Sequence, residues 1–107
     1  KSSAERVRVS FRVQFTLEAK ADLERLYRFL LEHDLIAAEK ALAAIDRAWL
    51  LLEEFPFSCR KIDETNPFLR ELIIPFGEAG YVALFDIEDQ HTVTVLAVRH
   101  QREDDYH

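Results

Sequence analysis

The carboxy-terminal end of the chain carries its densest group of side chains able to bind or cleave a charged ligand. An apolar run over residues 92–98 leads directly into a polar segment that contains Arg99, His100, Arg102 and Tyr106. Histidine exchanges protons near neutral pH, and arginine binds phosphate and carboxylate groups through its guanidinium. A strand that ends in such residues would present them at the rim of a sheet, within reach of a ligand or a partner protein.

These residue types would suit RNA cleavage, with Arg70 as a further candidate. A ribonuclease needs a group that activates the ribose 2′-hydroxyl, a group that protonates the leaving oxygen, and cations that stabilise the phosphorane. Arg70 and Arg102 would clamp the phosphate, and His100 would act as acid or base. Tyr106 would stack on a base or transfer a proton.

Each of these side chains also has a purely structural interpretation. Arg70 would pair with an acid on a neighbouring strand, and His100 would be a surface residue at a strand end. Tyr106 would anchor the end of the chain against a helix. The residue types alone do not decide between the two interpretations.

The distribution of charge bears on the kind of partner. Residues 1–60 hold ten basic and ten acidic side chains, whereas residues 61–107 hold four basic and ten acidic ones, so the net charge of −6 lies in the second part. Glu103, Asp104 and Asp105 directly follow Arg102. Because basic surfaces supply most of the affinity for nucleic acids, we expect no direct nucleic-acid binding and favour a protein partner.

Length and composition predict one globular domain. The 107 residues are 49% hydrophobic and include few glycines and prolines. Residues 1–6 are expected to form a tail, and residues 7–107 the domain. A lone Cys59 cannot form an internal disulfide, and without a signal peptide or membrane-length apolar run a cytoplasmic protein that avoids membranes is expected. His91 and His107 lack partners at metal-ligand spacing, so we expect no metal and no cofactor.

A strand and two helices are predicted in the first half of the chain. Alternating apolar and polar residues over 7–15 are typical of a half-buried strand. Thr16 is a suitable N-cap for a helix to about His33, and Asp34 for a second helix that stops before Pro56. The stripes expected to be buried are Leu23, Leu26, Tyr27, Leu30 and Leu31 in the first helix and Ala38, Leu42, Ile45, Trp49 and Leu52 in the second.

Three further strands are predicted in the second half. Residues 57–67 have turn composition, whereas residues 68–76, 81–87 and 92–98 are rich in Val, Ile, Leu and aromatics. The short connections between these runs require antiparallel pairing. The predicted fold is α+β, with the order β-α-α-β-β-β and a helical hairpin packed on a mostly antiparallel four-stranded sheet.

Several segments in this order resemble the RelE/ParE superfamily of toxins from type II toxin-antitoxin modules, also called plasmid stabilisation proteins. The resemblance covers about Val7 to Tyr106 and implies the same fold. The segments that carry it are Leu26-Tyr27-Arg28-Phe29-Leu30, Phe55-Pro56-Phe57-Ser58-Cys59-Arg60, Arg70-Glu71-Leu72, Gly80-Tyr81-Val82-Ala83-Leu84-Phe85 and Val95-Leu96-Ala97-Val98-Arg99-His100-Gln101-Arg102-Glu103-Asp104.

The resemblance implies two functions of different class. RelE-like members cleave mRNA in the ribosomal A site, whereas ParE-like members poison DNA gyrase by binding. The acids beside His100 would repel an RNA substrate, so we expect a ParE-like toxin with DNA gyrase as its target. A cognate ParD-like antitoxin, in a toxin-antitoxin hetero-oligomer, is the expected partner. The expected partner-binding residues are Arg70, Arg99, His100, Arg102 and Tyr106.

Two alternatives stay open. The first is a RelE-like ribosome-dependent mRNA endoribonuclease, whose catalytic residues would be Arg70, His100, Arg102 and Tyr106. The second is a non-toxic relative that keeps the fold and still binds an antitoxin.

Overall fold

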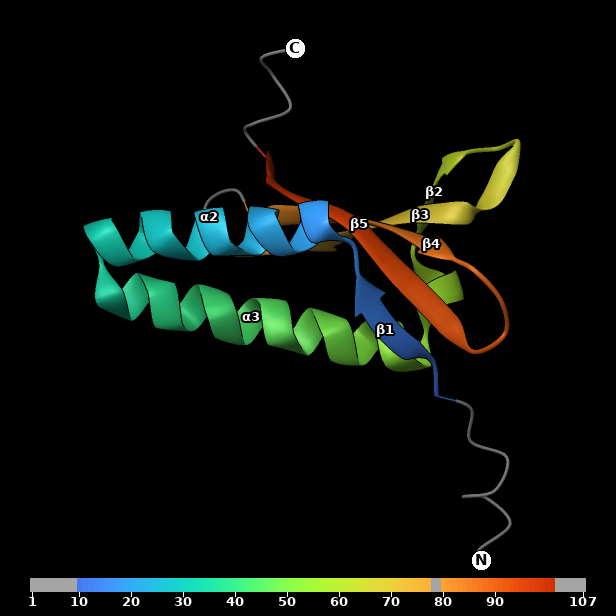
Figure 1. Ribbon diagram of the computed structural model, residues 1–107, viewed down its shortest axis with the longest axis horizontal. Helices are drawn as coiled ribbons and strands as arrows, with labels where there is room; N and C mark the ends of the chain where they lie inside the picture. The colour runs from blue at the N-terminus through green and yellow to red at the C-terminus, as the bar shows by residue number, and fades with distance from the viewer. Residues whose placement is uncertain (1–9, 78–79, 102–107) are drawn as a thin grey trace, which may run out of the picture.

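Two helices cover one face of a five-stranded sheet in the computed structural model, which describes residues 10–77 and 80–101 (Figure 1). This confirms the predicted two-layer α+β fold and its helical hairpin. The elements in chain order are β1 (Arg12–Phe15), α2 (Leu17–His33), α3 (Leu35–Glu54), the 3-10 turn η1 (Pro56–Ser58), β2 (Arg60–Asp63), β3 (Asn66–Ile74), β4 (Tyr81–Ile87) and β5 (Thr92–His100).

The strands lie in the order β1-β5-β4-β3-β2. β1 pairs with β5 in parallel, and every other neighbouring pair is antiparallel. The predicted count of four strands was wrong, because β2 lies in a segment expected to be a turn. All four β2 residues are exposed at the outer edge of the sheet, so the strand lacks the apolar alternation that would have identified it.

The helix boundaries follow the predicted caps. The Thr16 hydroxyl accepts a hydrogen bond from the Ala19 N–H at 3.0 Å, and an Asp34 carboxylate oxygen accepts from the Ile36 N–H at 3.0 Å. These bonds satisfy amide groups that have no partner inside the first turn of a helix. Asp34 therefore both ends α2 and starts α3.

The predicted buried stripes were only partly right. Tyr27, Leu31 and Leu42 are exposed, and small residues occupy much of the face turned toward the sheet. Small side chains allow a helix backbone to approach the sheet closely, a preference that hydrophobicity alone does not reveal. The buried residues are Ala19, Asp22 and Leu26 in α2 and Ala38, Ala41, Ile45, Ala48 and Leu52 in α3.

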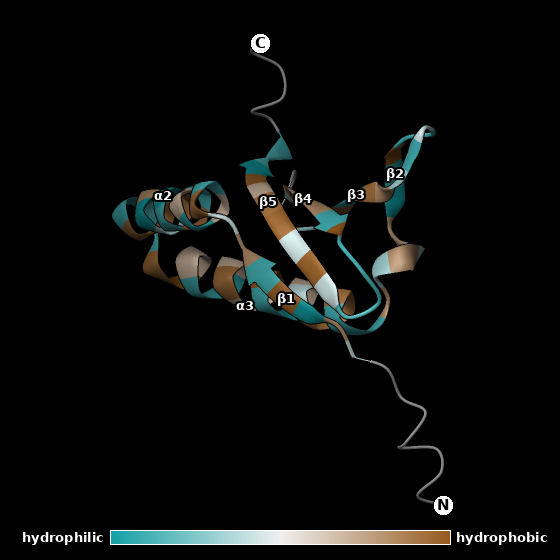
Figure 2. Ribbon diagram, turned by 45° about the vertical axis from the view of Figure 1, so that its right-hand side comes forward, coloured by the Kyte–Doolittle hydropathy of each residue, from teal (hydrophilic) through white to brown (hydrophobic). Residues whose placement is uncertain are grey.

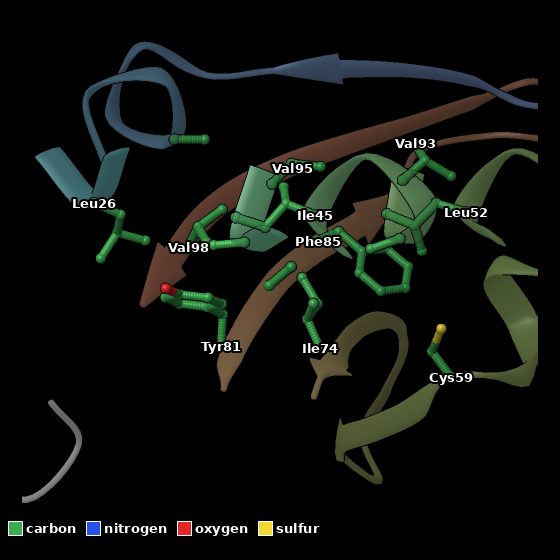
Figure 3. Packing of buried hydrophobic residues seen from close by; sticks show 14 of the residues in the cluster. Leu26, Ile45, Leu52, Cys59, Ile74, Tyr81, Phe85, Val93, Val95 and Val98 are labelled. Atoms are coloured by element: carbon green, nitrogen blue, oxygen red, sulfur yellow. The ribbon is translucent and has the colours of Figure 1, made fainter. Parts of the chain in front are cut away.

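The core lies between the helices and the middle strands. Ile45 and Leu52 of α3 point toward Phe85 of β4 and toward Val93 and Val95 of β5 (Figure 3). In Figure 2, brown bands alternate with pale ones along β5, which lies between β1 and β4. Burial of these side chains is the main favourable contribution to folding.

Helix α2 covers the part of β5 that β1 leaves open. β1 ends at Phe15, opposite Val95. Beyond that point the Thr16 hydroxyl donates to the Leu96 carbonyl at 3.1 Å, and the Val98 N–H donates to Asp22 Oδ2 at 2.9 Å. The side chains of Thr16 and Asp22 thus provide the hydrogen-bond partners that a neighbouring strand would otherwise supply to these backbone groups.

The amino-terminal strand can be compared with its prediction only in part. The described strand spans Arg12–Phe15, and residues 7–9 of the predicted strand lie outside the described residues, as does the predicted tail of residues 1–6. None of the helices in the described ranges is long and apolar enough to cross a membrane.

Candidate functional site

Arg99 and His100 lie at the carboxyl end of β5, as the sequence predicted. They pair with Val82 and Tyr81 at the start of β4. The His100 ring meets the Tyr81 ring edge to face, with centroids 5.5 Å apart, and Tyr81 itself stacks on Phe76 at 5.9 Å. This contact places His100 on the core side of the sheet and leaves Arg99 exposed on the other side.

Asp22 organises the charges beside this strand end. It is only 7% exposed, although it is an acid on a helix. Besides the Val98 N–H, it contacts the Arg25 guanidinium at 3.0 Å and Arg99 Nε at 3.8 Å. One buried carboxylate therefore holds two half-exposed guanidinium groups, from α2 and from β5, on one surface.

Asp22 is not among the residues that the sequence predicted for the site. A polar residue in an apolar helical stripe was the available signal, since Asp22 lies four residues before Leu26 on the face that packs against the sheet. A buried acid at such a position requires a partner, and here the partners are an edge N–H and two arginines.

Arg70 lies elsewhere and has a different environment. Its Nε donates to the Pro67 carbonyl at 2.7 Å, and Nη1 donates to the carbonyls of Phe57 and Cys59, both at 2.8 Å. The guanidinium carbon also lies 5.3 Å from the centre of the Phe57 ring. Arg70 thus links β3 to η1 and to the start of β2.

The predicted pairing of Arg70 with an acid across strands is not what these contacts show. The adjacent Glu71 forms the ion pair instead, with Arg60 of β2. Glu71 and Arg70 point to opposite faces of β3, as expected for neighbours in a strand. Glu71 therefore lies on the face of the sheet that the helices do not cover. The Arg70 guanidinium lies on the other face and donates to carbonyl groups.

Arg70 and His100 are far apart. Arg70 pairs with Phe85 of β4, whereas His100 pairs with Tyr81, four residues away along that strand, and β4 lies between β3 and β5. With about 3.3 Å per residue and about 4.8 Å between strands, their Cα atoms are roughly 16 Å apart. The fold does not bring these two candidates together.

Two predicted site residues, Arg102 and Tyr106, lie outside the described residues. Among residues 10–77 and 80–101, no group of three His, Cys, Asp or Glu side chains could hold a metal ion. Cys59 is buried, and burial raises the pKa of its thiol.

Comparison with known proteins identifies the family. The family model described as the ParE toxin of the type II toxin-antitoxin system parDE matches residues 13–105. Toxin RelE1 of Caulobacter vibrioides (strain ATCC 19089 / CIP 103742 / CB 15) is 35% identical over 74 residues, which cover 69% of this chain and 76% of the relative.

A solved structure shares the fold. It is described as the chromosomal ParDE TA system from P. aeruginosa, and it matches with a TM-score of 0.65 and 19% identity over 85% of this chain and 96% of that chain. The family match, the relative and the shared fold agree with one another. The chain belongs to the ParE toxin family, within the RelE/ParE superfamily of type II toxin-antitoxin toxins.

Proposed function

We propose that this toxin acts by binding DNA gyrase and does not cleave RNA, and that a ParD-like antitoxin neutralises it. In this proposal the contact surface includes Arg99, His100 and the neighbouring Arg25 at the end of β5. The toxin assignment itself rests on the family; the choice of target and mechanism is the proposal.

The separation of Arg70 from His100 is the observation that carries the proposal. RNA cleavage requires an acid-base group within hydrogen-bond reach of the reacting oxygen and a cation on the same phosphate. Arg70 donates to three backbone carbonyls and lies about two strands from His100. Because its guanidinium is held by these carbonyls, we do not expect Arg70 to bind the scissile phosphate or to stabilise the transition state of RNA cleavage.

The charge of the molecule also supports a protein target. A ribosome-dependent nuclease would have to approach highly charged RNA, and the net charge of −6 opposes that approach. A local patch of arginines on an otherwise acidic protein suits an acidic patch on a protein partner, where complementary charge raises the rate of association and selects the orientation.

The proposed antitoxin partner is supported by the family and by the sheet. One solved structure that shares this fold is described as a ParDE TA system. Strand β2 is an exposed edge with backbone groups that an extended segment can pair with, and the space between α3 and β3 is lined by Leu51 and Leu72. A partner segment that pairs with the edge would find apolar contacts next to it.

Substitutions at the strand end test the binding proposal. Arg99→Glu should weaken binding to purified gyrase at least about tenfold. The substitution replaces a positive side chain, which would attract an acidic patch on the partner, by a negative one that would repel it. His100→Gln keeps a hydrogen-bonding side chain of similar size and should weaken binding by no more than about threefold. Binding can be measured by biolayer interferometry, with supercoiling inhibition as the functional measurement.

Arg47→Glu is the matched control, since Arg47 is an exposed arginine of α3, on a different element from Arg25 and Arg99, and the charge change is the same. Equal losses for Arg99→Glu and Arg47→Glu would mean that total charge, not the strand end, determines binding. Retained gyrase binding together with loss of growth arrest in His100→Gln would contradict the proposal and indicate catalysis.

A further inference from the structure

A second surface with the features of a binding site lies at the other end of β5. Phe11, Phe57 and Phe68 line a hollow of about 730 Å³ together with Ile87 and the β4–β5 turn, residues 88–91. We call this hollow the phenylalanine pocket. In Figure 1 the β4–β5 turn, η1 and the chain that enters β1 lie at the same end of the molecule.

The three rings form one continuous apolar wall. The Phe57 ring meets the Phe11 ring at 6.5 Å and the Phe68 ring at 6.3 Å, both edge to face. Phe57 is 50% exposed and Phe68 is 49% exposed. Grouped aromatic side chains that stay half exposed around a hollow are typical of surfaces that bind another molecule.

The wall is fixed before any ligand arrives. The Arg70 guanidinium lies over Phe57 and bonds to the carbonyls of Phe57 and Pro67, the residue before Phe68. The Phe11 N–H donates to the carbonyl of Glu53 at 2.7 Å. A preformed pocket loses little conformational entropy on binding, which favours affinity.

The rim of the pocket is acidic. Glu88 and Asp89 lie on the β4–β5 turn, and the bond from the His91 N–H to Asp89 lowers the pKa of that carboxyl, so it is charged at neutral pH. The last turn of α3, which contacts Phe11 through Glu53, carries Glu53 and Glu54 and no basic residue. The carbonyl end of a helix carries partial negative charge, which these glutamates increase.

The described basic side chains near the rim are fewer than its acids and face elsewhere. Arg70 faces backbone carbonyls and the Phe57 ring, and Arg12 of β1 lies on the opposite face from Phe11 and Val13, which pack on the core. A positively charged group of a ligand would therefore be attracted to the rim while an apolar group fills the pocket.

We propose that the phenylalanine pocket binds a segment of the antitoxin in which a bulky apolar side chain stands beside a lysine or arginine. The proposal rests on the antitoxin partnership put forward above. The apolar side chain would enter between Phe57 and Phe68, and the basic one would lie against Asp89 and the end of α3.

Charge and position favour the antitoxin over other occupants. A second copy of this chain would bring a net charge of −6 to an acidic rim. The proposed gyrase contact lies at the opposite end of β5, about 26 Å away for a nine-residue strand. The pocket therefore lies outside the proposed gyrase contact and is available as an anchor point for the antitoxin.

The test compares binding of the full-length antitoxin to the full-length toxin and its variants by isothermal titration calorimetry. Phe57→Ala and Phe68→Ala should each weaken the complex about tenfold, as expected for anchor residues of an interface. Phe29→Ala is the matched control, because Phe29 is 56% exposed on α2 outside the pocket, and its affinity should change less than twofold.

The charge of the rim is tested separately. Asp89→Asn keeps an oxygen that can accept the His91 N–H and removes only the charge. It should weaken the complex about threefold at low salt and should reduce the dependence of affinity on salt. An unchanged salt dependence would contradict the acidic-rim part of the proposal.

A photo-crosslinking experiment tests the pocket even if an alanine variant fails to fold. p-Benzoylphenylalanine in place of Phe68 should crosslink to the antitoxin, at a peptide with an apolar residue next to Lys or Arg, and the same group in place of Phe29 should not. A crosslink to a second toxin copy, or none, would overturn the proposal. So would full antitoxin affinity in well-folded Phe57→Ala and Phe68→Ala.

Two outcomes separate this inference from the proposed function. If the toxin leaves gyrase active while its antitoxin affinity still depends on the pocket, the target proposal fails and the pocket assignment stands. If the pocket variants bind antitoxin normally but lose gyrase inhibition, the pocket belongs to the target interface and the assignment is wrong.

Discussion

The guanidinium of Arg70 stabilises the fold by joining β3 to the backbone around η1, at Phe57 and Cys59. Arg70→Ala removes its bonds to Phe57, Cys59 and Pro67 and leaves those carbonyls without this donor. We expect the free energy of unfolding to fall by about 2 kcal/mol, measured by urea denaturation.

Arg28→Ala serves as the control for this substitution, since Arg28 is exposed on α2, and it should change stability by less than about 0.5 kcal/mol. If Arg70→Ala leaves stability unchanged and still abolishes growth arrest, Arg70 acts on a substrate or target and its structural interpretation is wrong.

Tyr81 makes stability sensitive to high pH. It is 2% exposed, and burial raises the pKa of its phenol above the ordinary value of 10.0. The unfolded chain therefore loses this proton at a lower pH than the folded protein does. The contribution of Tyr81 is fully present below pH 10 and is lost as the pH rises through the folded-state pKa.

Tyr81→Phe removes this titration and should make the fall in stability above pH 10 less steep than in the wild-type protein. The measurement is the free energy of unfolding as a function of pH for both proteins. If the free energy of unfolding falls with pH at the same slope in both proteins, the fold does not raise the pKa of the Tyr81 phenol.

For single residues, the sequence predicted the position of a side chain in the fold more readily than the groups that the side chain contacts. The types and spacing of Arg99 and His100 predicted a group at a strand end, and that placement is observed. The partner of Arg70 was not predictable, because its carbonyl acceptors lie up to 13 residues away and depend on the path of η1 and β2. Asp22 was missed for the same reason: its partners on β5 are 76 and 77 residues distant.

At the scale of elements, Asp22 is the main polar link between α2 and β5. Asp22→Ala would leave the Val98 N–H without an acceptor and Arg99 and Arg25 without this shared carboxylate. We expect a loss of about 2 to 3 kcal/mol in the free energy of unfolding.

Asp22→Asn keeps an oxygen for the Val98 N–H and should lose less stability than Asp22→Ala. Glu24→Ala, on the exposed face of the same helix, is the control and should have little effect. Hydrogen exchange of the Val98 amide reports the link directly. Unchanged protection in Asp22→Ala would show that α2 and β5 hold together without this carboxylate.

The connection between β3 and β4 depends on a glycine. Gly80 has φ +112°, and a Cβ there would collide with the carbonyl oxygen of Ile74 and lie 3.0 Å from the Phe76 nitrogen. Gly77 also has a positive φ, +62°, but a Cβ would meet no atom within 4 Å. Gly80→Ala should therefore lower stability by about 3 kcal/mol, and Gly77→Ala by about 1 kcal/mol.

The comparison of these two variants by thermal unfolding separates backbone strain from steric collision. Gly77→Asn should be tolerated still better than Gly77→Ala, because asparagine adopts the left-handed region more readily than alanine does. Equal melting temperatures for Gly80→Ala and Gly77→Ala would contradict the collision at Gly80.

The elements that sequence reasoning recovered are those with strong local signals. Thr16 and Asp34 marked the helix starts, and runs rich in Val, Leu and aromatic residues marked β4 and β5. β2 was missed because an exposed edge strand does not need apolar residues. The parallel pairing of β1 with β5 joins residues 80 apart in the chain, and no local pattern predicts such a contact.

At the scale of the whole molecule, two surfaces lie at opposite ends of β5. One end presents Arg99 with Arg25, and the other presents the phenylalanine pocket with its acidic rim. The net charge was evident in the sequence, but the pocket was not, because its three phenylalanines lie before β1, in η1 and in β3. We expect the antitoxin to be anchored at the pocket end, so reversal of gyrase inhibition requires that the bound antitoxin also covers the end with Arg99 and Arg25.

The most direct test is a gyrase supercoiling assay beside a ribosome-dependent mRNA cleavage assay, with one toxin preparation and with or without antitoxin. We predict inhibition of supercoiling that the antitoxin reverses, and no mRNA cleavage. Cleavage of mRNA that is lost in His100→Ala, with supercoiling unaffected, would contradict the gyrase proposal and place the catalytic group at the end of β5.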